Sequence, residues 1–188
     1  MDHTALPYEK GSLPLSSWAP ARGRAHRRKP EEKGRDPYDG LRPWSAITHG
    51  VGAVLALAGT VLLLVRTALL GGGPWLLVSF SIYGASMIGL YTASTLYHCL
   101  NTSVRGRIAL RKYDHTSIYL LIAGTYTPIC LGPLRTQGAW GWVLFGVIWA
   151  LAAAGIVLTM GWINMPRALT ATIYIGMGWM AVVAVYPL

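Results

Sequence analysis

The sequence predicts an all-α, polytopic membrane protein built as a bundle of transmembrane helices. Hydrophobic residues make up 53% of the 188-residue chain and charged residues only 12%, whereas soluble domains usually carry about 25% charged residues. Apolar stretches of about 20 residues recur along the chain, which is the length needed to cross a hydrocarbon core of roughly 30 Å. We expect each stretch to be a helix, because a helix satisfies its own backbone hydrogen bonds in lipid.

Residues 1–43 precede the first apolar stretch and are rich in proline and basic residues. They contain too few periodic apolar residues to build a core, so we predict a disordered tail. Basic tails bind nucleic acid or acidic lipid. Beside a membrane domain we favour a cytoplasmic tail that sets the topology, and we expect no nucleic-acid partner. Residues 44–188 form the predicted transmembrane helical domain.

Five spans are expected in this domain, and they cover about residues 47–70, 75–98, 115–131, 140–162 and 169–186. Tryptophans lie near the predicted ends, where amphipathic rings favour the membrane interface; they are Trp44, Trp75, Trp140, Trp142 and Trp162. Small residues at four-residue spacing predict close helix contacts in the first and fourth spans. These stripes are Gly52-Ala56-Thr60 and Gly146-Ala150-Ala154.

Basic residues gather on one side of the predicted membrane domain. The loops on the other side carry only Arg66 and Arg135. The positive-inside rule therefore predicts a multi-pass protein of the cell membrane with a cytoplasmic N-terminus. Cys99 and Cys130 are expected at opposite membrane faces as free thiols, because a disulfide needs Cα atoms within about 7 Å.

Five polar residues are predicted at the cytoplasmic level of the spans: His49, Ser94, His98, Asp114 and His115. Ser94 and His98 are four residues apart and therefore share one helix face. Asp114 is the only acidic residue after Asp39. Ionisable residues at this depth are costly and tend to pair or to serve function.

Structural roles for these residues are also open. Asp114 is equally expected to pair with Arg111 or Lys112 and to cap the start of the third span. His49 and His115, each taken alone, are expected to bond to the backbone at the interface.

Two kinds of chemistry are considered for this group. A serine hydrolase is disfavoured, because the sequence has no Gly-x-Ser-x-Gly nucleophile elbow. A metal site suits the residue types better, since imidazole is a common zinc ligand and a nearby carboxylate orients water. A catalytic zinc usually has three protein ligands, and the spacing supplies only His98.

The same stretches resemble the bacterial hemolysin III family, in the broad superfamily of the progestin and adipoQ receptors and the alkaline ceramidases. The resemblance covers about residues 44–188, and the tail lies outside it. The matching motifs are Ala46-Ile47-Thr48-His49-Gly50-Val51-Gly52, Ser79-Phe80-Ser81-Ile82-Tyr83-Gly84-Ala85-Ser86, Ser94-Thr95-Leu96-Tyr97-His98, the stretch from Asp114 to Pro128, and Met177-Gly178-Trp179.

The resemblance implies a seven-helix bundle with a zinc site near the cytoplasmic face. It implies that His98 is a zinc ligand and that Asp114 contacts the metal through water, with Ser94 in the same motif as His98. Two further ligands would come from a His-x-x-x-His motif on the seventh helix, which this sequence does not contain. We therefore expect five of seven helices, and an incomplete zinc site for which His49 or His115 are weaker substitutes.

Two functions follow from these observations. The first is a zinc-dependent membrane hydrolase that acts on a lipid amide at the cytoplasmic leaflet, with Asp114 and Ser94 positioning water or substrate. The second is a non-enzymatic membrane protein, either a pore-forming, cytolytic factor or a receptor. The spans offer few polar residues for a conducting path, which disfavours a pore. The lipid bilayer is the expected partner in both cases.

Overall fold

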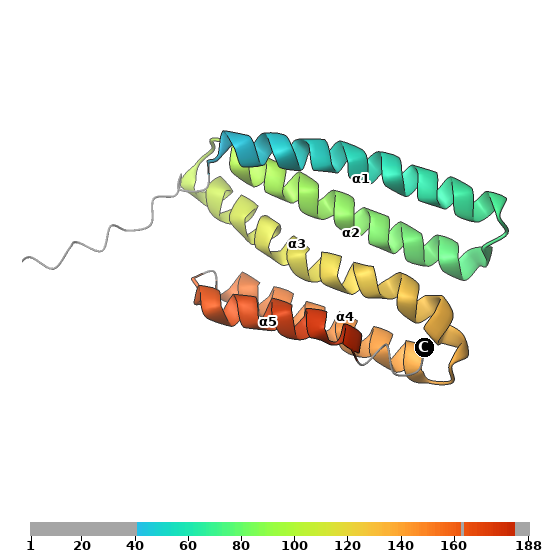
Figure 1. The fold of residues 1–188 in the computed structure, drawn as a ribbon. Coiled ribbons are helices and arrows are strands. Elements are labelled where there is room, and N and C mark those ends of the chain that lie inside the picture. Colours follow the sequence, from blue (N-terminus) through green and yellow to red (C-terminus); the bar gives the residue numbers. More distant parts are fainter. Residues whose placement is uncertain (1–40, 163, 183–188) are drawn as a thin grey trace, which may run out of the picture. The chain divides into compact units, whose positions relative to one another are not determined.

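The computed structural model describes residues 41–162 and 164–182, and these residues form a helical bundle (Figure 1). The described helices are α1 (Pro43–Leu69), α2 (Gly73–Cys99), α3 (Val104–Leu131), the short 3₁₀ helix η2 (Pro133–Thr136), α4 (Trp140–Gly161) and α5 (Arg167–Trp179). The described residues contain no strand. The prediction of a disordered tail falls almost entirely outside the described part of the chain.

Local sequence explains where the first two helices begin and end. A proline stands in the first turn of α1 and of α2, where its fixed φ suits the helix and its missing N–H costs nothing. Between these helices the chain reverses through Gly71 and Gly73, whose φ values are 68° and 75°. Glycine adopts this left-handed region without strain, so the two helices connect through a tight turn.

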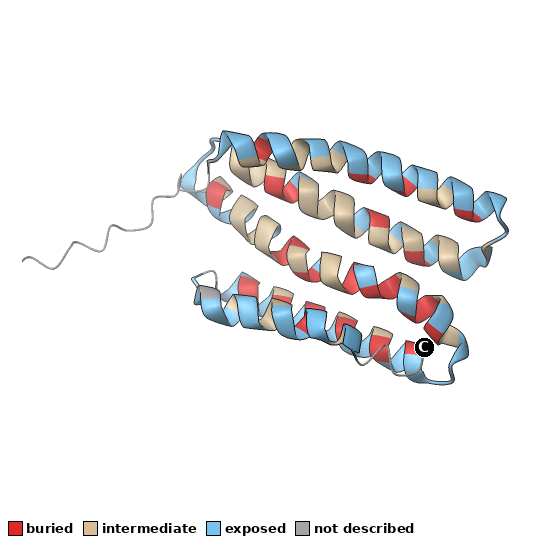
Figure 2. Cartoon of the chain, viewed as in Figure 1, coloured by how far each residue is buried: buried red, intermediate tan, exposed pale blue. Residues whose placement is uncertain are grey.

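The helices pack in chain order, with α2 between α1 and α3 and with α4 and α5 on the other side of α3 (Figure 1). Figure 2 shows buried residues along α3, while α1 is mostly exposed. The main apolar core joins α3 to α4, η2 and α5. Its members are Tyr119, Ala123, Tyr126, Cys130, Leu134, Leu144, Ile148, Ala152 and Met177.

Three described helices, α1, α2 and α4, are long and apolar enough to cross a membrane. The other two predicted spans are also helices, but they differ from the expectation. Helix α3 begins at Val104 and includes the basic stretch before residue 115. Helix α5 has only 13 residues, and the end of the predicted fifth span lies outside the described residues.

The predicted small-residue stripe is confirmed in α1 and wrong in α4. Ala56 and Thr60 are buried, and a Cβ on Gly52 would lie 2.8 Å from the ring of Tyr91 on α2. The three residues Gly146-Ala150-Ala154 of α4 are exposed instead. The opposite stripe of α4 faces α3, with Gly155 directly against the ring of Tyr119. Spacing alone does not tell which of two small-residue stripes meets a neighbour.

Candidate functional site

The polar residues predicted to act together come from α1, α2 and α3 at one end of the bundle, which we call the histidine end. A backbone hydrogen bond holds the start of α1 to the end of α2. The backbone N–H of Arg42 donates to the carbonyl of His98 at 3.1 Å. About two helical turns further along α1, His49 lies beside the last turns of α2.

His49 and Ser94 form a direct side-chain hydrogen bond. His49 Nδ1 lies 2.7 Å from Ser94 Oγ, and Ser94 is only 5% exposed. Which atom donates depends on the tautomer of the imidazole. The expectation that His49 bonds to the backbone is thus wrong, because a buried hydroxyl on the neighbouring helix supplies its partner.

His98 lies on the same side of α2 as Ser94, as the four-residue spacing predicted. Its ring centre is 6.0 Å from that of His49 and 5.0 Å from that of Tyr97. Two imidazoles from two helices therefore flank one buried serine. Nitrogen and oxygen donors of this kind suit either proton transfer or metal binding.

Asp114 lies inside α3 and does not cap it. Ser103 is the N-cap, and its side chain accepts a hydrogen bond from the backbone N–H of Gly106 at 3.3 Å. The capping role predicted for Asp114 is therefore wrong, because a serine and a run of helix-forming residues start the helix earlier. The Asp114 side chain is 17% exposed, with Oδ2 3.8 Å from Nδ1 of His115.

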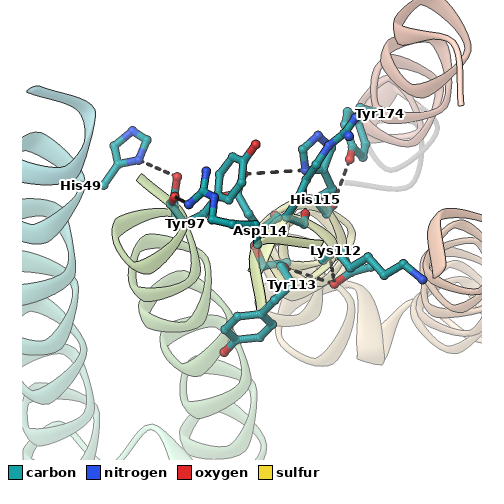
Figure 3. Close-up of polar contacts among 12 residues, drawn as sticks. His49, Tyr97, Lys112, Tyr113, Asp114, His115 and Tyr174 are labelled. Atoms are coloured by element: carbon teal, nitrogen blue, oxygen red, sulfur yellow. Dashed lines mark hydrogen bonds and ion pairs between the residues drawn. The ribbon is translucent and has the colours of Figure 1, made fainter. Parts of the chain in front are cut away.

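His115 takes the structural role that the sequence suggested for it. Its Nδ1 lies 2.8 Å from the carbonyl oxygen of Arg111, one helical turn earlier. Its own carbonyl accepts a hydrogen bond from the hydroxyl of Tyr174 at 2.9 Å, so α5 is joined to α3 here (Figure 3). Lys112 donates to the carbonyl of Met160 at the end of α4.

Tyr97 links the α2 residues to the α3 residues. Its ring lies 5.0 Å from His98 and 6.5 Å from His115 between ring centres, and 4.6 Å from the guanidinium carbon of Arg107. Figure 3 shows Tyr97 and His115 in the same group of polar residues. His98 and Asp114 are thus connected through Tyr97 and His115. Direct cooperation between them stays a prediction.

Arg107 is the residue of this end that the sequence did not single out, except as one of several basic residues in a connector. It is 1% exposed, and its Nη1 donates to the carbonyls of Tyr97 and Leu100, the latter at 3.0 Å. These carbonyls end α2, where a helix leaves acceptors unsatisfied and carries partial negative charge. Arg107 therefore closes the end of the helix that carries Ser94 and His98. The nearest signal in the sequence was its place shortly after an expected helix end.

Sequence comparison assigns the family. The family model described as Haemolysin-III related matches residues 43–188. The chain belongs to the hemolysin III family. It is 42% identical over 144 residues to a hemolysin-3 homolog of Bacillus subtilis (strain 168), an alignment that covers 77% of this chain and 66% of that protein.

A second relative, hemolysin-3 of Bacillus cereus, is 40% identical over 144 residues, which cover 77% of this chain and 64% of that protein. The chain therefore spans just under two thirds of the length of these relatives. No solved structure matches it. Family membership and the apolar helices establish a multi-pass membrane protein of the hemolysin III family that resides in a lipid bilayer.

The described residues of this hemolysin III chain fit a zinc ion only in part. A catalytic zinc usually has three protein ligands and one open position. Two imidazoles, those of His49 and His98, lie near each other, but no group of three His, Cys, Asp or Glu side chains in residues 41–162 and 164–182 is placed to hold a metal. His98 would be one ligand of a set that needs members from outside these residues.

The two cysteines confirm the expected free thiols. Cys99 is exposed at the end of α2, and Cys130 is buried near the end of α3. The two thiols lie at the ends of different helices and form no disulfide with each other.

Proposed function

We propose that this hemolysin III protein is a membrane hydrolase with its active site at the histidine end, where His98 is one ligand of a zinc ion. The substrate class that we propose is a lipid amide, and the proposed location is the cytoplasmic leaflet of the cell membrane. The basic residues near this end support a cytoplasmic N-terminus through the positive-inside rule.

The observation that carries the proposal is the hydrogen bond between His49 and Ser94 beside His98. A buried hydroxyl that lies 2.7 Å from an imidazole of the neighbouring helix is a positioned polar group. Ionisable groups at membrane depth are expensive and usually functional. Their convergence from two helices therefore supports a site more strongly than the residues did in sequence.

The residues of the chain have separate proposed roles. Zinc is a Lewis acid that polarises carbonyl groups and activates water. His49 fixes the direction of the Ser94 hydroxyl, and the partly exposed carboxylate of Asp114 is available to hold water or the amide N–H of a substrate. The lipid-amide class rests on the resemblance to the alkaline ceramidases, which is an argument by analogy.

The metal content of the purified protein tests the proposal. Because the described residues supply only part of a ligand set, the readout is a difference in zinc affinity, and we expect His98→Ala to lower the zinc affinity of the detergent-solubilised protein by at least about tenfold. His26→Ala is the matched control, because that histidine lies in the tail, outside the residues that the family model matches. Equal zinc in the His98→Ala variant and the parent would remove His98 from the site.

Hydrolysis is tested separately with proteoliposomes that contain an N-acylated lipid. Release of the fatty acid by the parent and its loss in Asp114→Asn would support the reaction. A zinc-binding chain that releases no fatty acid would contradict the hydrolase proposal and leave His98 as a metal ligand.

A cytolytic function is the second candidate, because the relatives in Bacillus subtilis and Bacillus cereus are named as hemolysin-3 proteins. We expect dye leakage from liposomes if the chain forms a pore. Leakage that is unchanged in His98→Ala and after zinc chelation would favour a pore over the hydrolase.

A further inference from the structure

The opposite end of the bundle carries a polar feature that the proposed hydrolase does not use. Here the start of α2 meets η2, and Arg135 of η2 lies over the ring of Trp75, with its guanidinium carbon 5.2 Å from the ring centre. The two residues line a cavity of about 340 Å³. We call this cavity the arginine pocket.

Arg135 carries a positive charge, and no carboxylate among the described residues pairs with it. Its Nε is buried and has no hydrogen-bond partner among the described residues. Asp114 is the only acidic residue after Asp39. It is far from the pocket, because Leu131, which lines the pocket, is 17 residues further along α3, or about 26 Å at 1.5 Å per residue. A buried cationic donor without a partner is costly, so the pocket suits an anionic ligand.

The other walls of the pocket favour the same charge. Gly73 and Pro74 begin α2 at the pocket, and no side chain caps this helix start. The first N–H groups of a helix point outward and carry partial positive charge. The positive partial charge of the helix start therefore adds to the positive charge of Arg135. Both features favour an anion in the pocket.

The aromatic residues indicate the depth of the pocket in the membrane. Trp75 packs edge-to-face on Trp142, with ring centres 5.5 Å apart, and both are more than 40% exposed. Tryptophans prefer the headgroup level of a bilayer. The pocket also has apolar walls from Leu76 and Leu131, which suit the glycerol and upper acyl region of a lipid.

We propose that the arginine pocket binds the phosphate of an anionic phospholipid, with Arg135 donating to the phosphate oxygens. Guanidinium and phosphate form strong, charge-assisted hydrogen bonds. The apolar walls and the interfacial tryptophans distinguish a lipid headgroup from free phosphate. This site is independent of zinc and of the hydrolase proposed above.

Native mass spectrometry of the detergent-solubilised chain tests this site with phosphatidylglycerol as the probe. We expect Arg135→Gln to weaken binding by about tenfold to a hundredfold. Arg66→Gln is the matched control, because Arg66 is an exposed arginine at the end of α1 that does not line the pocket. Diacylglycerol, which lacks the phosphate, is expected to bind no better to the parent than to Arg135→Gln.

Arg135→Lys provides a second variant if Arg135→Gln does not fold, and we expect it to bind with intermediate affinity. Equal phosphatidylglycerol binding by the parent and both variants would overturn the site. Binding of diacylglycerol as tight as that of phosphatidylglycerol would also overturn it. Displacement of the lipid by millimolar inorganic phosphate would show a site for the free ion instead of a lipid.

Discussion

Two arginines, one at each end of α2, lie over an aromatic ring of that helix and differ in what they bind. Arg107 stacks on Tyr97 and donates to two backbone carbonyls at the end of α2. Arg135 stacks on Trp75 at the start of α2, and its Nε has no partner among the described residues. From Trp75 to Tyr97 the helix rises about 33 Å, close to the thickness of a hydrocarbon core.

The difference follows from the polarity of the helix. The end of a helix exposes carbonyls, which accept hydrogen bonds from an arginine, whereas the start exposes N–H groups, which cannot. Arg107 therefore has acceptors within the protein for its Nη1, and these two hydrogen bonds stabilise the histidine end. Arg135 lies near N–H groups, which offer it no acceptor, and its Nε has no partner among the described residues. The two ends thus suit an internal structural role and an external anion.

The largest effect on stability is expected from replacing Arg107 at the histidine end. Arg107→Met should lower the free energy of unfolding by about 2–4 kcal/mol, because it leaves the carbonyls of Tyr97 and Leu100 without this donor. Unfolding in mixed micelles measures the change. Arg105→Met is the matched control, since Arg105 is exposed near the start of the same helix and should change stability by less than about 0.5 kcal/mol. Equal effects of the two substitutions would contradict a stabilising role for the hydrogen bonds from Arg107 to the end of α2.

A smaller effect is expected inside the histidine end. Ser94→Ala should cost about 0.5–1.5 kcal/mol, because His49 loses its hydrogen bond across the α1–α2 contact. Ser81→Ala on the same helix is the control, as Ser81 is exposed and its hydroxyl donates to the carbonyl of Leu77 within its own helix. A change in the NMR signals of the His49 ring in Ser94→Ala, but not in Ser81→Ala, would locate the effect. An unperturbed imidazole would argue against the contact.

The smallest effect on stability is expected at the arginine pocket. Arg135→Met in lipid-free detergent should change the free energy of unfolding by about 0.5 kcal/mol or less, because the lost cation–π contact is offset by removal of an unpartnered buried donor. Phosphatidylglycerol should raise the melting temperature of the parent, since a ligand of the native state stabilises it. The same lipid should leave Arg135→Met unchanged. A large loss of stability without lipid would mean that Arg135 is satisfied internally.

The helices were predictable because their causes are local. Apolar length placed α1, α2 and α4, and the glycine and proline turns separated α1 from α2 close to the predicted residues. The start of α3 was missed, because the basic residues before Asp114 suggested a loop while Ser103 caps a helix there. The inward stripe of α4 was also missed. In a helix that is apolar all round, composition does not distinguish the face toward α3 from the face toward lipid.

Sequence was sufficient for the class of protein, the membrane residence and the shared face of Ser94 and His98, because hydrophobic length and helical period follow from the order of residues. Tertiary packing decided that His49 bonds Ser94, that Arg107 closes α2, and that Arg135 overlies Trp75. These contacts join residues up to 60 positions apart along the chain. Whether a polar group finds a partner depends on which helix ends meet, and only the folded bundle brings those ends together.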